Sequence, residues 1–301
     1  PTRPNRRFDL GKRGDGLGAA GPVFVCNSRR REARYSERMK AHDTARFLTF
    51  ADTLADAARK AILPYFRADH GVSNKGGDRF DPVTDADRAS EQVMRVLIEG
   101  AFPDHGIYGE EFGESQGASG YQWGLDPIDG TRAFIAGLPT WGVLIALNYE
   151  GKPIVGVMDQ PYLDERYRGW NDGANATARG VTRTLTTRAC GSLSDAIIST
   201  TDPYLFRADD EAAAFARARK SAKLARYGYD CYAYSMIAAG HIDAVIENNL
   251  KPFDICALIP IVTGAGGGVC SWTGGDAAQG GSVLAYGDAQ LRDEALSLLA
   301  S

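Results

Sequence analysis

The sequence has few cysteines and no pairing pattern among them. Five cysteines occur in 301 residues, an odd number, and none stands in a C-x-x-C arrangement. Such cysteines are typical of small buried apolar residues in a reducing compartment rather than of a disulfide framework. We therefore expect no disulfide-stabilised fold.

Long apolar runs are also missing. No stretch of the sequence approaches the roughly 18 apolar residues that a membrane span needs. No apolar segment follows the N-terminal arginines as it would in a secretory signal. A cytoplasmic protein without a membrane partner is therefore expected.

The sequence has no excess of positive charge. Its formal net charge is −4, whereas a nucleic-acid-binding domain usually presents a basic face. We expect no nucleic-acid partner. With 44% hydrophobic residues, the chain can build a sizeable core, which excludes an intrinsically disordered class.

Residues 1–38 lack hydrophobic periodicity. They contain ten basic and four acidic residues and several glycines, so the remaining chain is the acidic part of the molecule. We expect a poorly structured N-terminal extension, with Met39 as the start of the natural chain. An organellar transit peptide is the alternative, and the four acidic residues count against it.

One stretch of the chain, WGLDPIDGTRAF, concentrates chemistry-bearing residues. Its apolar lead predicts a strand that ends in a tight turn with two carboxylates, Asp126 and Asp129. Pro127 fixes one φ angle, and Gly130 allows the φ > 0 conformation in which the backbone turns back. Two carboxylates and the Thr131 hydroxyl are oxygen ligands of the kind that Mg²⁺ prefers. By itself, such a motif is most often a solvated turn.

Further acidic residues favour the metal site over the solvated turn. Glu110 and Glu111 follow a short apolar run, and Asp87 lies in DPVTDAD, ahead of a helix-like pattern. Asp254 lies in KPFD, which opens another helical pattern. Four acidic sites in this order and setting are hard to obtain by chance.

Together these motifs resemble the signatures of the inositol-monophosphatase superfamily of Mg²⁺-dependent, lithium-sensitive phosphatases. The matching segments are the Glu-Glu pair, DPIDGT and FDICALIPIVTGAGG. The resemblance covers residues 39–301, and GYDCYAYSMIAAGHIDAVIENNLKPFDICALIPI is most similar to the histidinol-phosphatase branch. It implies inhibition by Li⁺ and a homodimer, which the family commonly forms.

The resemblance also implies an α+β fold, a layered αβαβα sandwich. The residue pattern agrees, since a helix over residues 44–66 is followed by strands over residues 141–149 and 152–160. Two parts are predicted. Residues 39–187 would form an α+β half that carries most of the metal ligands, and residues 188–301 an α/β half that completes the site.

Strands and helices alternate in the second half, which predicts a mostly parallel sheet with helices on its faces. One helix is expected to be continuous over residues 253–263, beginning at the Asp254 motif. Glu110 and Glu111 are expected at the end of a strand, where consecutive side chains point to opposite faces. Only one of them would then bind a metal directly, and the resemblance selects Glu110.

Ligand chemistry and the resemblance together assign a site for two or three Mg²⁺ ions. The metal ligands would be Glu110, Asp126, the Ile128 carbonyl, Asp129 and Asp254. Thr131, Asp87 and Glu110 would act in catalysis by orienting or activating the attacking water. The substrate would be bound by Asp129, Gly130, Thr131, Asp230 and Glu247.

Some of these assignments have alternatives. Asp230 is placed in the substrate site because the inositol branch tends to have small neutral residues there, but it could also cap the helix that begins at Cys231. Glu91 lies four residues after Asp87 on the same helix face and could also face the metals, but it is interpreted as a helix surface charge. Lys75 is given a weak electrostatic role near the metals.

The resulting hypothesis is a Mg²⁺-dependent phosphomonoesterase that hydrolyses histidinol phosphate through a metal-activated water. An inositol monophosphatase or a broad sugar-phosphate phosphatase is the alternative, because only the rim of the pocket would differ. The expected partner is a small phosphate monoester. A binding protein that keeps the fold without turnover is disfavoured by the complete set of acidic residues.

Overall fold

The computed structural model describes residues 41–68, 73–74 and 82–299. The chain divides into two units, residues 1–40 and residues 41–301, and the first unit lies wholly outside the described residues. The predictions for the N-terminal extension and for Lys75 also lie outside them. The second unit is compact, and all that follows concerns it.

An eight-stranded sheet runs through the second unit in the order β10-β9-β8-β7-β6-β5-β3-β4. Neighbouring strands are antiparallel except for β3 and β5, which are parallel. The strands are β3 (Gly106–Gly109), β4 (Gly113–Ser115), β5 (Tyr121–Asp129), β6 (Gly142–Tyr149), β7 (Lys152–Gln160), β8 (Glu165–Trp170), β9 (Gly173–Ala178) and β10 (Val181–Thr184).

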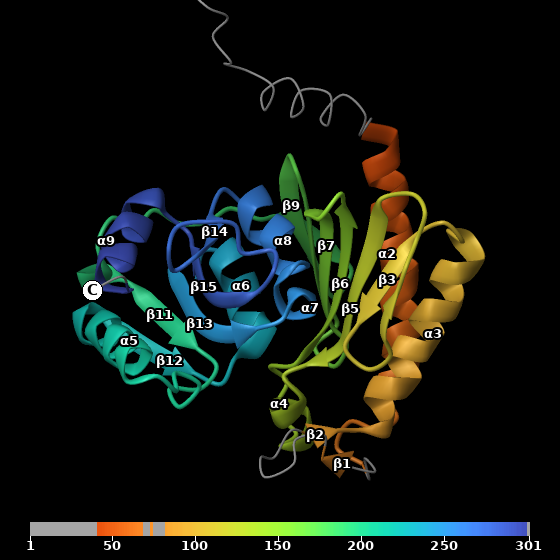
Figure 1. Cartoon of the computed structure of the whole chain (residues 1–301), viewed down its shortest axis with the longest axis horizontal. Coiled ribbons are helices and arrows are strands. Elements are labelled where there is room, and N and C mark those ends of the chain that lie inside the picture. The colour runs from red at the N-terminus through yellow and green to blue at the C-terminus, as the bar shows by residue number, and fades with distance from the viewer. Residues whose placement is uncertain (1–40, 69–72, 75–81, 300–301) are drawn as a thin grey trace, which may run out of the picture. The chain divides into compact units, whose positions relative to one another are not determined.

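Two long helices, α2 (Ala41–Ile62) and α3 (Asp85–Ala101), cover one face of this sheet (Figure 1). The apolar stripe of α2, with Phe47, Leu54 and Ala58, is buried. Burial of such a stripe against a sheet is what stabilises an amphipathic helix in a domain. The helix predicted over residues 44–66 is confirmed, although it begins and ends slightly earlier.

The other sheet has five strands in the order β12-β11-β13-β15-β14. Only the pairs β11–β12 and β11–β13 are parallel, so the prediction of a mostly parallel sheet is wrong. The reason is that β14 and β15 are joined by a loop without a helix, which reverses the chain direction. The strands are β11 (Ile197–Thr200), β12 (Leu224–Tyr227), β13 (Ala244–Leu250), β14 (Gly268–Ser271) and β15 (Gly281–Tyr286).

The remaining helices complete five layers (Figure 1). The helices α6 (Asp230–Ala238), α7 (Pro252–Ile255) and α8 (Leu258–Gly264) lie between the sheets, and α8 contacts both β8 and β14. The helices α5 (Asp209–Ser221) and α9 (Ala289–Leu299) pack together on the outer face of the five-stranded sheet. The predicted α+β fold with αβαβα layers is confirmed.

The helix expected over residues 253–263 is interrupted. Helix α7 ends at Ile255 and α8 begins at Leu258. Pro260 has no N–H group to donate to the carbonyl four residues earlier, so the helical hydrogen-bond ladder breaks there. The chain also lies very close to the large sheet, since a Cβ on Gly156 would fall 1.9 Å from the Ala257 carbonyl oxygen.

The shorter elements are β1 (Ser73–Asn74), β2 (Pro82–Val83), α4 (Thr131–Ile135) and the 3₁₀ helix η1 (Leu193–Asp195). Strands β1 and β2 pair with each other. Among the helices of the described residues, none has the length and apolar character needed to cross a membrane.

A buried charge cluster ties α2 to the large sheet. Asp159 on β7 is fully buried and accepts hydrogen bonds from Arg59 of α2 at 2.6 Å and from Arg166 of β8 at 2.7 Å. Arg166 also donates to Asp52 and Asp56 of α2. Each guanidinium therefore has a carboxylate partner, as buried charges require.

We predict that Asp159→Asn lowers the free energy of unfolding by about 3 kcal/mol, because it leaves two arginines beside a neutral amide. The matched control is Asp164→Asn, which also removes a 2.6 Å partner of Arg59 but from an exposed side chain. That change should cost less than about 1 kcal/mol. Urea unfolding measures both, and equal losses would contradict the account of this cluster.

Candidate metal centre

The irregular end of β5 and the turn at Gly130 are shaped by their own side chains. Asp126 and Asp129 were predicted in a turn after the strand, but both lie within β5. Asp126 accepts a hydrogen bond from the Ile128 N–H at 3.1 Å, and the Thr131 hydroxyl donates to the Ile128 carbonyl at 3.1 Å. Gly130 has φ of 83° and caps α4, a conformation that a residue with a Cβ adopts at a cost. The pairing of β5 with β6 is irregular between Asp126 and Asp129. Asp126 pairs with Leu144 and Asp129 with Gly142, so the irregularity lies at the two residues between the carboxylates.

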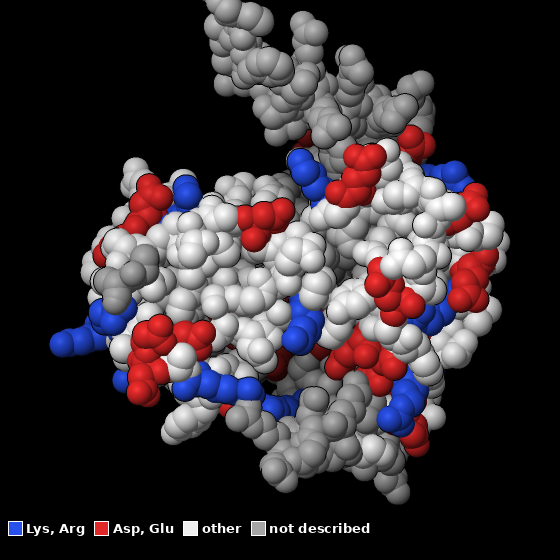
Figure 2. Space-filling model, viewed as in Figure 1, with Lys and Arg blue, Asp and Glu red and all other residues white. Residues whose placement is uncertain are grey.

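Asp254 joins these two carboxylates from a distant part of the sequence. It lies in the first turn of α7, where it accepts the Lys251 N–H at 2.6 Å. One ligand oxygen from each of Asp126, Asp129 and Asp254 lies within 4.8 Å of the others. The sequence prediction that these three acids share a site is supported by this geometry. On the face shown in Figure 2, a group of acidic side chains lies to the right of where Figure 1 places α4 and α7.

Glu110 lies beside this group. It is in the turn after β3 rather than on the strand, and its N–H donates to the Leu125 carbonyl at 3.1 Å. Its carboxyl shares a hydrogen bond with Asp126. The structure therefore brings Glu110 to the edge of the cluster, one residue beyond the end of β3.

Asp87 faces the same region from the start of α3. Its Oδ2 accepts hydrogen bonds from the N–H of Thr84 at 2.8 Å and from its hydroxyl at 2.5 Å, which makes a capping box. Its Oδ1 is buried and has no hydrogen-bond partner among the residues that the structure describes. A buried oxygen of this kind fits a bound water or cation.

The carboxyl groups of the cluster have raised pKa values. Desolvation, followed by repulsion from Asp254, raises the pKa of Asp129 to about 7. Desolvation likewise raises the pKa of Asp254 to about 7, and desolvation and Glu110 raise the pKa of Asp126 well above its ordinary value. An oxygen-only group that resists ionisation fits a hard divalent cation, which would offset the repulsion.

The helix α6 approaches this cluster with its first turn. The N–H of Cys231 donates to Asp129 at 2.6 Å. Tyr229 occupies the N-cap position and Asp230 makes no capping hydrogen bond, so the capping interpretation of Asp230 is wrong. Instead, Asp230 has φ of 46° and packs against Gly130, where an added Cβ would lie 2.9 Å from its Cγ.

Asp230 and Glu247 both form hydrogen bonds with Thr201. Glu247 is buried in the middle of β13 and accepts the Thr201 N–H at 2.6 Å and the Thr200 hydroxyl at 3.3 Å. Asp230 hydrogen-bonds to the Thr201 side chain. Desolvation raises the pKa of Asp230 to about 7 and that of Glu247 to about 8. The two residues predicted to bind the substrate therefore lie close together, beside Asp129.

Two residues of this region were missed in the sequence. Glu91 is fully buried and bonded to Arg95, so its interpretation as a surface charge is wrong. The Tyr234 hydroxyl is buried without a hydrogen-bond partner among the described residues, and Glu247 and Asp129 are among its charged neighbours. No sequence signal distinguished Tyr234 from a core aromatic residue of α6.

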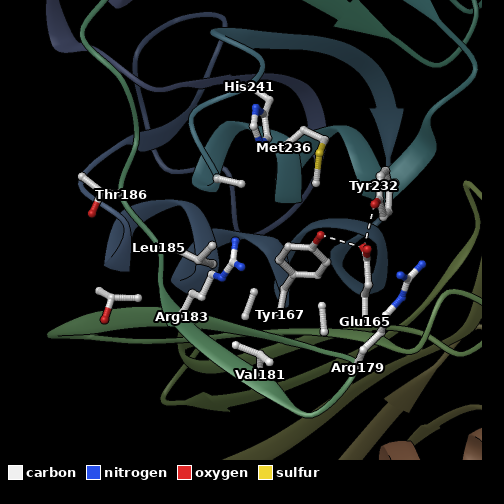
Figure 3. Close-up of a pocket in the computed structure, with 14 residues that line it drawn as sticks. Glu165, Tyr167, Arg179, Val181, Arg183, Leu185, Thr186, Tyr232, Met236 and His241 are labelled. Atoms are coloured by element: carbon white, nitrogen blue, oxygen red, sulfur yellow. Dashed lines mark hydrogen bonds between the residues drawn. The ribbon is translucent and has the colours of Figure 1, made fainter.

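A separate cavity of about 700 Å³ lies between β8, β9, β10 and α6 (Figure 3). Its carboxylate, Glu165, accepts hydrogen bonds from Tyr167 at 2.9 Å and Tyr232 at 2.6 Å. None of the predicted site residues lines it, and a single carboxylate offers too few oxygen ligands for a hard cation. The candidate metal centre is therefore the acidic cluster and not this cavity.

We predict a pH dependence of stability in the metal-free protein. Asp129 and Asp254 have ordinary pKa values of 3.8 and folded values of about 7, so between roughly pH 4 and 7 the folded state holds protons that the unfolded chain has released. Stability must then fall as pH rises through this window. In EDTA, the Tm should drop by several degrees between pH 5 and pH 8.

A divalent cation should raise the Tm more at pH 8 than at pH 5, because it competes with protons for the same oxygens. Scanning calorimetry measures both effects. Asp129→Asn is the control, since it removes one of the titrating groups and should flatten the dependence. If the Tm of Asp129→Asn falls as steeply with pH as the Tm of the unmodified protein, the assignment of the titrating acids is refuted.

Comparison with known proteins identifies relatives that share this fold. Residues 43–299 match the model of the inositol monophosphatase family. The chain is 41% identical over 290 residues to the Arabidopsis thaliana protein named bifunctional phosphatase IMPL2, chloroplastic, covering 92% of this chain and 82% of that protein. It is 38% identical over 221 residues to a histidinol-phosphatase of Chlorobaculum parvum, covering 73% of this chain and 83% of the relative.

A solved structure agrees with these sequence relatives. An inositol monophosphatase from Zymomonas mobilis superposes with a TM-score of 0.76 at 38% identity, covering 87% of this chain and all of that one. The family match spans most of the chain and includes every residue of the acidic cluster. The chain therefore belongs to the inositol monophosphatase family of phosphatases.

Proposed function

We propose that this protein is a Mg²⁺-dependent phosphomonoesterase that hydrolyses histidinol phosphate to histidinol and phosphate. The observation that carries the choice of substrate is the pair of carboxylates, Asp230 and Glu247, that meet at Thr201 beside the acidic cluster. They lie outside the group of three acids whose oxygens converge. We assign them to the organic part of the substrate, which would share the oxygens of the buried Glu247 with Thr200 and Thr201.

The metal ligands in this proposal are Glu110, Asp126, Asp129, Asp254 and the Ile128 carbonyl. Mg²⁺ bound there would neutralise phosphate oxygens, lower the pKa of a water molecule and stabilise the leaving alkoxide. All of these ligand atoms are oxygens, as Mg²⁺ requires. Two or three ions per site, and inhibition by Li⁺, are proposed from the family resemblance.

The residues of the chain would place the attacking water. The Thr131 hydroxyl donates its hydrogen to the Ile128 carbonyl, so its oxygen is left to accept a hydrogen from water. Asp87, whose buried Oδ1 has no partner among the described residues, would hold the same water from the side of α3, together with Glu110. Gly130 and Thr131 would contact the phosphate at the turn. Attack would be in line, without a covalent enzyme intermediate.

Charge favours histidinol phosphate over a neutral polyol. Histidinol carries an ammonium group and an imidazole, and either can donate to a carboxylate. The pKa of Asp230 and that of Glu247 are raised chiefly by desolvation, and a bound cation would return both groups to the charged form. An inositol brings hydroxyl groups only. Relatives named histidinol-phosphatase support the choice.

A neutral phosphate ester is the second candidate. The neighbour from Zymomonas mobilis is named an inositol monophosphatase, and the acidic cluster alone does not distinguish among phosphate monoesters. A homodimer and a cytoplasmic location are further proposals. They follow from the family resemblance and from the cysteine pattern respectively.

We predict that Asp230→Asn and Glu247→Gln each lower kcat/KM for histidinol phosphate by about one to two decades more than for inositol 1-phosphate. A lost charge-assisted hydrogen bond is worth roughly 1.5–3 kcal/mol, which corresponds to this factor. Asparagine also tolerates the positive φ of residue 230, so the backbone should be preserved. Phosphate release at fixed Mg²⁺ measures the effect.

Two controls complete this experiment. Asp126→Asn removes a metal ligand and should depress all substrates together. Asp209→Asn changes an exposed acid at the start of α5 and should change none. Equal losses on histidinol phosphate and inositol 1-phosphate in Asp230→Asn would refute the histidinol assignment and favour the neutral ester.

A further inference from the structure

The turn that contains Glu110 is hydrogen-bonded to a buried ion pair on α3. Glu91 is fully buried, and its two carboxylate oxygens accept the N–H of Glu111 at 2.7 Å and the N–H of Phe112 at 3.2 Å. These are the two residues that directly follow Glu110. A charged carboxylate on backbone N–H groups makes a strong, directional contact.

Arg95, one turn further along the same helix, makes further hydrogen bonds to this turn. Its Nε donates to Glu91 at 2.7 Å, and its Nη2 donates to the Gly113 carbonyl. Its Nη1 reaches the Ser115 hydroxyl at 3.3 Å. One ion pair thus contacts four residues, from position 111 to position 115, that follow Glu110.

The sequence leaves space for this ion pair at Gly109. A Cβ on Gly109 would lie 2.1 Å from Oε1 of Glu91 and 2.4 Å from its carboxyl carbon. Any larger residue would push the Glu91 carboxylate off the turn. The absence of a side chain immediately before Glu110 is therefore needed for the contact.

The other side of the turn is fixed to the metal centre itself. The N–H of Glu110 donates to the carbonyl of Leu125, the residue before Asp126. Glu110 is thus held between β5 on one side and the α3 ion pair on the other. Asp87, one helical turn before Glu91, also lies close enough to Glu110 for an electrostatic interaction between the two carboxyl groups.

From this arrangement we infer that Glu91 and Arg95 are positioning residues, which fix Glu110 where it can bind the metal. The inference rests on the proposed metal dependence but not on the choice of substrate. Mutation of residues that contact a metal ligand but not the metal typically weakens metal binding 10- to 100-fold. The signature is therefore weaker metal binding rather than loss of the fold or of the chemical step.

The test is Glu91→Gln, which keeps the shape of the side chain but turns an NH₂ group toward donors. Mg²⁺ binding is titrated calorimetrically without substrate, and Mg²⁺ dependence of phosphate release is measured separately. The Kd for Mg²⁺ should rise about 10- to 100-fold. At saturating Mg²⁺, kcat should return close to that of the unmodified protein.

Glu99→Gln is the matched control, because it removes the same charge from an exposed position on α3 and should leave the Kd unchanged. An unchanged Kd in folded Glu91→Gln would overturn the inference. So would a loss of kcat that saturating Mg²⁺ does not restore, since that pattern belongs to a purely structural residue.

Gly109→Ala provides a second route if Glu91→Gln does not fold. It displaces the Glu91 carboxylate without removing any charge, and it should also raise the Kd for Mg²⁺ at least 10-fold. A wild-type Kd in this variant would overturn the inference. Failure of the histidinol phosphate assignment would leave all these Mg²⁺ titrations unaffected, so the two proposals fail separately.

Discussion

Carboxylates repel one another when they share a site that is withdrawn from water, and the chain around Asp126 is built to withstand that repulsion. Asp126, Asp129 and Asp254 present oxygens within 4.8 Å of one another, and Glu110 shares a hydrogen bond with Asp126. In the absence of a cation, the folded protein can relieve this repulsion only by holding protons, as the raised pKa values show. Binding of a divalent cation would also reduce the repulsion among these carboxylates.

The fold supplies a backbone N–H group or a fixed turn for most of these acids. The start of α6 donates the Cys231 N–H to Asp129, and Asp254 accepts the Lys251 N–H at the start of α7. Both helices belong to the middle layer between the two sheets (Figure 1). The layered arrangement thus brings the turn after β5 together with helices that follow it by more than one hundred residues.

The local parts of this site could be predicted from the sequence, because the turn chemistry of DPIDGT is contained in six adjacent residues. The contacts of Glu91 could not be, since a buried and an exposed helical glutamate follow the same spacing, and only the position of the β3–β4 turn decides between them. For a similar reason the direction of β15 was wrong, because β15 follows β14 through a connection without a helix and therefore runs antiparallel to its neighbours. Pro260 was a readable signal that the helix after Asp254 is interrupted, and it was missed.

The central claim is that the acidic cluster holds the catalytic metal, and diffraction from crystals grown with Mn²⁺ tests it most directly. Anomalous density should appear in contact with the carboxylates of Asp126, Asp129 and Asp254, with Glu110 and the Ile128 carbonyl as further ligands. Full Mn²⁺ occupancy elsewhere, with these acids bonded only to protein groups, would contradict the account.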